Sequence, residues 1–326
     1  MEQLGARAML TATAFYLDPT VANPIIDTTS KIWHVGYPTG PLGTWVNGTS
    51  SIAVIQGAVS TDQITVAASV TARDIIFGLG GPYSLYFPAG ASHRISGGTV
   101  SFQSTLTINV AAIAMAEINS TMVGAGGLKT TGTGTLIVSS ASNAYSGGTN
   151  IAYGTLKLMK DPSTQSGAAL GTGAVLIGTA GVLDLNGCPL TVSDFGDDAT
   201  ADGYGGTVTD TSSGVRGSPV GVTVLTIAVP SGQTDTFTGS IDDLHGNDGG
   251  SSSASIRLVK TGAGTLDLGG TYDTSSDFTG GTELDRGKLV LGSSQALGTF
   301  TDGQYPSLKV NGGELDLNHW GSSSAL

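Results

Sequence analysis

Two stretches of the chain have similar sequences: Leu-Lys-Thr-Thr-Gly-Thr-Gly-Thr-Leu at residues 128–136 and Leu-Val-Lys-Thr-Gly-Ala-Gly-Thr-Leu at residues 258–266. Four further pairs of blocks follow them in the same order. These are Tyr-Ser-Gly-Gly-Thr at 145–149 and Phe-Thr-Gly-Gly-Thr at 278–282, Gly-Thr-Leu-Lys-Leu at 154–158 and Gly-Lys-Leu-Val-Leu at 287–291, Ala-Leu-Gly-Thr at 169–172 and 296–299, and Leu-Asp-Leu-Asn at 183–186 and 315–318. The offsets are 130, 133, 133, 127 and 132 residues, which identifies an internal repeat.

Short segments within both copies alternate apolar and polar residues, as in Leu156-Lys157-Leu158 and Leu266-Asp267-Leu268. A period of two is typical of β-strands that turn one face inward. Glycine pairs or Gly-x-Gly separate such segments about every 8–12 residues, where corners need a positive φ. No window keeps a helical period, and the best helical candidate is the short stretch 2–10. The sequence therefore predicts an all-β fold.

A β-sandwich and a β-solenoid both produce many short alternating strands. The ordered long-range repeat, the glycine-rich corners and a composition of 51 Gly, 42 Thr and 35 Ser with only 12% charged residues favour the solenoid. In a solenoid, equivalent residues of successive coils stack about 4.8 Å apart, so large or charged side chains clash. We predict a right-handed, single-stranded parallel β-helix (β-solenoid) of roughly a dozen coils, with about 20–25 residues in each.

The predicted solenoid divides into five segments. Residues 1–50 hold Trp33, Trp45 and four prolines, which suits an irregular N-terminal cap over the first coil. The other segments are a β-solenoid with degenerate repeats (51–120), the first repeat copy (121–192), inter-repeat coils with longer loops (193–253) and the second copy (254–326). The last residues, 321–326, show no cap pattern, so we expect either a longer protein or an end that meets another molecule, a second copy included.

Charge and cysteine content exclude several classes of function. The chain has 13 basic and 25 acidic residues and a net charge of −12, which gives no electrostatic footprint for nucleic acid or an anionic membrane surface. A single cysteine, Cys188, excludes an intrachain disulfide and a cysteine zinc cluster, and we expect it to be a small core residue. No apolar run reaches the length of about 18 residues that a membrane-spanning helix needs.

The polar cluster Asp242, Asp243, His245, Asn247 and Asp248 is the densest in the chain. Its carboxylates Asp242, Asp243 and Asp248 are candidate Ca²⁺ ligands, because calcium prefers oxygen donors. Their spacing is not the D-x-D-x-D-G pattern of a calcium loop, and a solvated polar loop is the other interpretation. Calcium is the one cofactor for which the sequence offers candidates.

A second acidic group consists of Asp197 and Asp198, with Asp194, Asp202 and Asp210 nearby. Two carboxylates at the right separation act as acid and base on a glycosidic bond, so this group is the candidate for a hydrolytic site. The four histidines share no metal-ligand spacing, and no G-x-S-x-G nucleophile elbow occurs. We therefore assign no catalytic residue and expect no enzymatic activity.

The repeated blocks, of the type L-x-K-x-G-x-G-T-L, Y-S-G-G-T, G-T-L-x-L, A-L-G and L-D-L-N-G, resemble the autotransporter-associated β-strand repeat. This repeat, also called the passenger-associated transport repeat, occurs in large bacterial surface proteins. The two copies cover about 120–192 and 254–318, and Gly43-Thr44-Trp45-Val46-Asn47-Gly48 resembles the way such passengers begin. The resemblance implies an exported protein at the cell surface or outside the cell, and it implies no reaction.

These observations predict an extracellular structural or adhesive rod of a bacterial surface protein, with end-to-end self-assembly into fibres as an extension of the hypothesis. Its expected partners are further copies of itself, other surface components or a glycan. The alternative is a polysaccharide-binding or polysaccharide-degrading β-helix protein. That alternative predicts a groove with exposed aromatic residues and clustered carboxylates with Lys or Arg opposite, for which 8 Phe, 9 Tyr, 3 Trp and 13 basic residues are few.

Overall fold

The computed structural model contains only strands, turns and loops in the residues that it describes. These residues are 13–18, 21, 24–48, 51–55, 63–66, 70–77, 83–88, 92–160, 167, 169–199, 205–212, 222–243, 255–269, 276–292, 296–298 and 308–317. No helix occurs in these ranges, and nearly all strand pairs are parallel, which confirms the all-β prediction. The helical candidate at residues 2–10 lies outside them.

The strands are short and evenly distributed along the chain. In the first half they are β1 (Thr13–Leu17), β2 (Ile25–Ile26), β3 (Trp33–Val35), β4 (Leu42–Gly43), β5 (Ser51–Ile55), β6 (Gln63–Val66), β7 (Val70–Phe77), β8 (Tyr83–Phe87), β9 (Ser92–Phe102), β10 (Leu106–Val110), β11 (Met115–Ile118), β12 (Thr121–Gly124), β13 (Leu128–Thr131), β14 (Thr135–Val138), β15 (Ala144–Tyr145) and β16 (Thr149–Leu158). In the second half they are β17 (Val175–Asp184), β18 (Leu190–Val192), β19 (Phe195–Asp197), β20 (Thr207–Thr209), β21 (Val222–Ala228), β22 (Thr234–Thr236), β23 (Ser240–Asp242), β24 (Ser255–Thr261), β25 (Thr265–Leu268), β26 (Thr282–Leu284), β27 (Lys288–Leu291), β28 (Leu308–Val310) and β29 (Glu314–Asp316).

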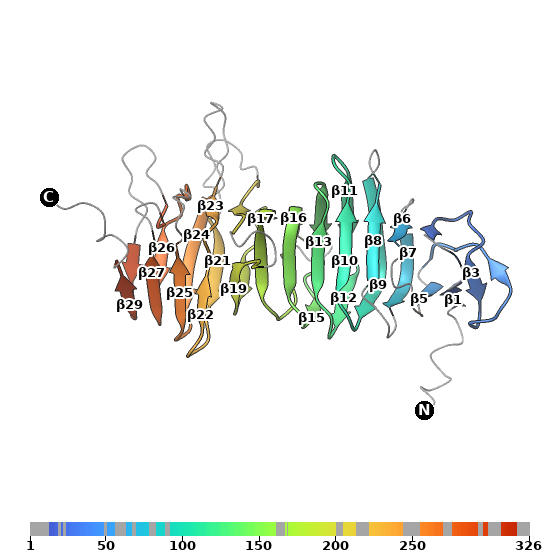
Figure 1. The fold of residues 1–326 in the computed structure, drawn as a ribbon, viewed down its shortest axis with the longest axis horizontal. Helices are drawn as coiled ribbons and strands as arrows, with labels where there is room; N and C mark the ends of the chain where they lie inside the picture. Colours follow the sequence, from blue (N-terminus) through green and yellow to red (C-terminus); the bar gives the residue numbers. More distant parts are fainter. Residues whose placement is uncertain are drawn as a thin grey trace.

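Successive strands wind into a β-solenoid in which each coil lies beside the next. Leu106 pairs with Leu128, 22 positions later, and Leu128 pairs with Thr149, 21 positions later. In the second half the ladder β21–β24–β26–β28 runs beside the ladder β22–β25–β27–β29. β1 lies at one end of an elongated molecule and β29 at the other (Figure 1). Parallel pairing therefore recurs along the molecule's length, in sheets of 20, 5 and 4 strands.

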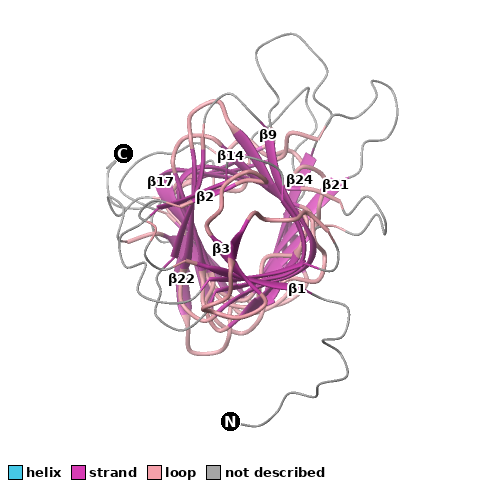
Figure 2. Ribbon diagram, turned by 90° about the vertical axis from the view of Figure 1, so that its right-hand side faces the viewer, coloured by secondary structure: helices cyan, strands magenta, loops and turns pink. Residues whose placement is uncertain are grey.

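The interior of the solenoid is filled with apolar side chains from every coil. In β10 the burial pattern alternates strictly, with Leu106, Ile108 and Val110 buried and the residues between them partly exposed. Viewed along the long axis, the strands form a ring around this interior (Figure 2). The alternation that predicted strands thus also identifies the residues that form the core.

Glycine corners connect the strands of each coil, and two equivalent ones show why no other residue fits. Gly154 and Gly287 both adopt a positive φ, of 70° and 74°. A Cβ at Gly154 would lie 2.5 Å from the carbonyl oxygen of Gly132, and a Cβ at Gly287 would lie 2.3 Å from that of Gly264. The coils stack through backbone at these corners, so the repeat blocks keep glycine for both conformation and space.

The N-terminal end differs from the parallel ladder. β1 pairs in parallel with β5, but it also pairs antiparallel with β3, which in turn pairs antiparallel with β4. Trp33 and Trp45 are buried and lie against each other, with ring centroids 5.4 Å apart. Solenoid pairing therefore begins inside the segment 1–50, while the β3–β4 hairpin and the two tryptophans cover the end of the core.

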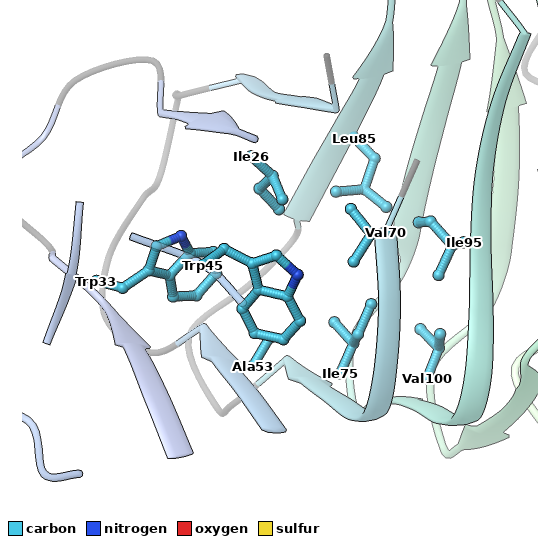
Figure 3. Close-up of a pocket in the computed structure, with 9 residues that line it drawn as sticks. All are labelled: Ile26, Trp33, Trp45, Ala53, Val70, Ile75, Leu85, Ile95 and Val100. Carbon is cyan, nitrogen blue, oxygen red and sulfur yellow. The ribbon is translucent and has the colours of Figure 1, made fainter. Parts of the chain in front are cut away.

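A small apolar cavity lies beside these tryptophans (Figure 3). Its volume is about 10 Å³, which is about the room that one water molecule needs, and its lining is apolar apart from the indole N–H groups of Trp33 and Trp45. The cavity is a packing defect where the irregular end meets the regular coils, not a ligand site. It is lined by Ile26, Trp33, Trp45, Ala53, Val70, Ile75, Leu85, Ile95 and Val100.

Candidate functional site

The two repeat copies carry different polar side chains in the core at equivalent positions. In the first copy the hydroxyl of Tyr145 lies 2.6 Å from that of Thr149, and burial raises the pKa of Tyr145. In the second copy Phe278 replaces the tyrosine, and the buried hydroxyl of Thr282 has no hydrogen-bond partner in the described part of the chain. The missing phenol oxygen explains the unpaired threonine.

A buried lysine distinguishes the second copy. Lys260 occupies the position of Thr130, whose hydroxyl donates only to the carbonyl oxygen of Tyr153 at 3.2 Å. The Lys260 side chain is fully buried, and its Nζ donates to the carbonyl oxygens of Thr261, Gly262 and Arg286 at 2.7, 3.0 and 3.2 Å. Burial lowers the pKa of this amine. Because Arg286 belongs to the next corner, Lys260 joins two coils.

Two of the calcium candidates, Asp242 and Asp243, accept hydrogen bonds from backbone N–H groups. The Asp242 carboxylate accepts from the Ser240 hydroxyl at 2.8 Å and from the Asp277 N–H at 3.1 Å, and burial raises its pKa. Asp243 is fully buried and accepts from the N–H groups of Ile256 and Thr279. The interpretation as a solvated loop is wrong for Asp243, because its side chain turns inward to join the next coil. Asp248 lies outside the described residues.

The carboxylates of the second acidic group also bind local backbone. Asp197 accepts from the Thr238 N–H at 2.9 Å, and Asp210 accepts from the N–H groups of Gly187 and Ser212 at 3.0 and 2.9 Å. Asp198 is buried as well, and Asp202 lies outside the described ranges. Burial raises the pKa of Asp197. Asp197 and Asp210 thus connect turns of adjacent coils.

An ion pair links two coils next to this group. Lys157 and Asp184 are register partners, and their Nζ and Oδ2 atoms lie 3.0 Å apart with the Asp184 side chain almost fully buried. The hydroxyl and N–H of Thr211 donate to the same carboxylate at 2.5 and 3.0 Å. The aspartate of the Leu-Asp-Leu-Asn block therefore fastens the end of the first copy to the coil that follows.

The remaining candidates are dispersed. Cys188 is buried, as expected for a core residue, and its Sγ lies 3.8 Å from the Asn186 carbonyl oxygen. His34 is bonded to the Gly40 carbonyl oxygen at 2.7 Å, and His93 is buried against Phe87. His245 and His319 lie outside the described part. Within that part, no three His, Cys, Asp or Glu side chains gather as a metal-binding group.

A polar pocket opens on the outer face of the second copy. It has a volume of about 130 Å³ and is lined by Arg257, Gly280, Gly281, Thr282, Glu283 and Lys309. Lys309 Nζ lies 2.6 Å from Glu283 Oε1, and Asn311 donates to the same oxygen at 2.6 Å. These hydrogen bonds, from Lys309 first and then Asn311, lower the pKa of Glu283, which keeps its carboxylate charged.

Sequence reasoning did not find this pocket, because its charged residues come from three different coils. The only available signal was the comparison of the copies: Arg257 and Glu283 stand where the first copy has Gly127 and Asn150. Lys309 is the register partner of Glu283, and Leu176 is the register partner of Asn150. Lys309 therefore corresponds to Leu176 of the first copy. The first copy therefore lacks the charges of the second at the same place.

In the described residues there is no helix that would be able to cross a membrane. The model of the passenger-associated transport repeat matches residues 128–158 and 258–291. Over 209 residues, or 62% of its length, the chain is 30% identical to the adhesin BmaC autotransporter of Brucella suis biovar 1 (strain 1330). It spans only 5% of that protein's length. No solved structure matches the chain.

Both matched segments lie inside the two copies identified from the sequence, and each contains the corners and buried threonine positions described above. A passenger repeat together with similarity to an autotransporter adhesin gives an extracellular or cell-surface location, in agreement with the prediction. The chain therefore contains two segments that match the passenger-associated transport repeat, and it is similar over 62% of its length to an autotransporter adhesin.

Proposed function

We propose that this chain is a section of an extracellular rod that gives a bacterial surface protein its length and carries adhesive contacts. The observation that supports this most is the parallel pairing of successive coils, which is found from β1 and β5 at one end to β27 and β29 at the other and forms three sheets (Figure 1). Its hydrogen bonds run along the long axis, and each contributes about 1 kcal/mol. Many such bonds in parallel give a slender molecule stiffness.

The polar groups of the interior support a mechanical role. Lys260, Asp184 and Asp243 each connect one coil to the next through backbone groups or an ion pair. Groups used in this way are neutralised and immobile, which is unsuited to proton transfer at a substrate. We therefore propose a non-enzymatic role, and similarity to a protein named as an adhesin supports it.

The finer features of this rod belong to the same proposal. Parallel crossovers in one sheet are right-handed in about 98% of cases, so we propose a right-handed solenoid, with about a dozen coils and the five segments given above. We also propose that rods join end to end. In the described residues β28 pairs only with β26 and β29 only with β27, and Leu308 and Val310 are 41% and 51% exposed.

Attachment of beads coated with the purified chain tests the adhesive role. The proposal expects more beads on epithelial cells or extracellular matrix than with chain that was unfolded before coating. Equal numbers would contradict it, and release of reducing ends from acidic or neutral polysaccharides would favour the enzymatic alternative. Light scattering tests end-to-end joining: particle mass must rise with concentration, and a monomer at all concentrations would refute it.

A further inference from the structure

The pocket of Arg257, Glu283 and Lys309 has a floor that cannot be filled by side chains. A Cβ at Gly280 would lie 2.2 Å from the carbonyl oxygen of Ile256, and Gly281 has a φ of +82°. Both positions therefore need glycine for the coil to stack. The bare backbone leaves a depression of about 130 Å³ between the side chains of neighbouring coils.

The charges around this floor are fixed in place by one another. Glu283 binds Lys309 Nζ and Asn311 Nδ2 through the same oxygen, Oε1. The exposed Arg257 has only a long contact in the described part of the chain, from Nε to the Gly280 carbonyl oxygen at 3.4 Å. Arg257 and Lys309 are the two cations of the lining and Glu283 is its one carboxylate. A second carboxylate, Asp285, lies beside the lining and accepts from the same Asn311 Nδ2 at 2.6 Å.

These groups match a ligand with one negative charge and several hydroxyls. The guanidinium fork of Arg257 suits a carboxylate, which it can bind in a bidentate manner. Glu283 repels a second negative charge, and its carboxylate can accept from hydroxyl groups. At physiological ionic strength the Debye length is about 8 Å, so nearby cations act on such a ligand more than the distant negative charges do.

We propose that this pocket binds a terminal sugar that carries a carboxylate, such as a uronic or a sialic acid. The inference rests on the proposed adhesive function and names the chemistry of one contact for it. Arg257 and Lys309 bind the carboxylate, and Glu283 positions Lys309 and accepts from the ring hydroxyls. The first copy, with Gly127, Asn150 and Leu176 at these positions, does not bind such a sugar.

NMR titration of the complete chain with methyl β-D-glucuronide and with the methyl glycoside of N-acetylneuraminic acid tests the proposal. We expect the Arg257 Nε–H signal to shift with at least one of the two, with a dissociation constant on the order of 1 mM. Methyl β-D-glucoside is the control for a sugar without a carboxylate. Acetate is the control for a carboxylate without a sugar. No shift with either acidic glycoside, or equal binding of acetate, would overturn the proposal.

Three variants assign the binding to the pocket. Arg257→Ala is expected to weaken it about tenfold, because a charge-assisted bidentate contact is lost. Glu283→Gln is expected to strengthen binding of acetate, because the repelling charge is removed. Arg94→Ala is the matched control: Arg94 is an exposed arginine paired with Glu117 at 3.4 Å on another coil. An equal loss in Arg257→Ala and Arg94→Ala would refute the assignment.

The outcome is separable from that of the bead experiment. Beads that attach to cells while the chain ignores both acidic glycosides would refute this inference and leave the adhesive rod intact. Glycoside binding without bead attachment would refute the adhesive role of the rod, while the assignment of an acidic sugar to the pocket would stand.

Discussion

The two passenger repeats share their backbone and differ in the groups inside and outside it. Their corner glycines, Gly154 and Gly287, have nearly the same φ and the same close backbone neighbours. Inside, the Tyr145–Thr149 hydrogen bond of the first copy is absent from the second, where Phe278 replaces the tyrosine. At a different position, the buried Lys260 with three carbonyl partners takes the place of Thr130. The comparison shows that the repeat specifies the coil path, while the means of joining coils varies.

Substitution of the corner glycines tests the shared part of this comparison and has the largest expected effect. Gly154→Ala and Gly287→Ala are each expected to cost about 2–4 kcal/mol, from a strained φ and a backbone clash. Hydrogen exchange at the Thr155 and Lys288 amides, which donate across the respective corners, measures the local loss. Gly232→Ala is the control: its φ is +79° but nothing lies near its added Cβ, so about 1 kcal/mol is expected. Equal losses at all three would contradict the steric argument.

Lys260→Met tests whether the second copy depends on its buried amine. We expect a loss of about 1–3 kcal/mol, because three carbonyl oxygens lose a donor. Thr130→Val in the first copy removes a single hydrogen bond and is expected to cost about 1 kcal/mol. Hydrogen exchange of the Asp285 amide, which donates to the Lys260 carbonyl oxygen, reports the change. A more stable Met variant would show that desolvation of the amine outweighs its hydrogen bonds.

The same lysine predicts a dependence of stability on pH. Burial lowers the pKa of Lys260 in the folded chain below its ordinary value of 10.5. Between the two pKa values the unfolded chain binds more protons, so the contribution of this group to stability rises with pH across that window. The rise must be absent in Lys260→Met, and an unchanged pH profile would contradict a depressed pKa.

Exchange of the aromatic residues between the copies has a smaller expected effect. Tyr145→Phe removes the hydrogen bond to Thr149 and is expected to cost about 1 kcal/mol. Phe278→Tyr supplies a partner for the Thr282 hydroxyl and is expected to gain up to about 1 kcal/mol where the ring keeps its position. Urea unfolding followed by hydrogen exchange in each copy measures both changes. Destabilisation by Phe278→Tyr would show that the second copy has no room for the phenol oxygen.

The turn before each copy gives the smallest predicted effect. Ile113 and Gly232 occupy the same position of this turn, with φ of 59° and 79°, and the Ile113 side chain is 93% exposed. A left-handed conformation strains a β-branched residue by about 1 kcal/mol, so Ile113→Gly is expected to stabilise the coil before the first copy and Gly232→Ile to destabilise the coil before the second. Urea unfolding of the two variants checks this prediction: the midpoint is expected to rise for Ile113→Gly and to fall for Gly232→Ile. Midpoints that shift in the same direction would contradict it.

Features that recur in the sequence were predictable, and features that depend on neighbouring coils were not. The strands around Leu156, Leu266 and Leu308 follow from period-two alternation, and the corners follow from paired glycines. The pocket joins Arg257 and Lys309, which are 52 positions apart, so it appears only once the register of the coils is known. Asp243 looked like a loop residue because its backbone partners, Ile256 and Thr279, belong to other parts of the coil.

Disulfide formation between adjacent coils tests the central claim, a parallel solenoid in the stated register, most directly. Lys129 and Asn150 are register partners on the outer face, whereas Thr149 faces the core. Neighbouring strands lie about 4.8 Å apart, within the Cα separation that a disulfide needs. In a Cys188→Ala background, the account predicts that K129C/N150C oxidises to an intramolecular disulfide and that K129C/T149C does not. Oxidation of the second pair in preference to the first would contradict the register.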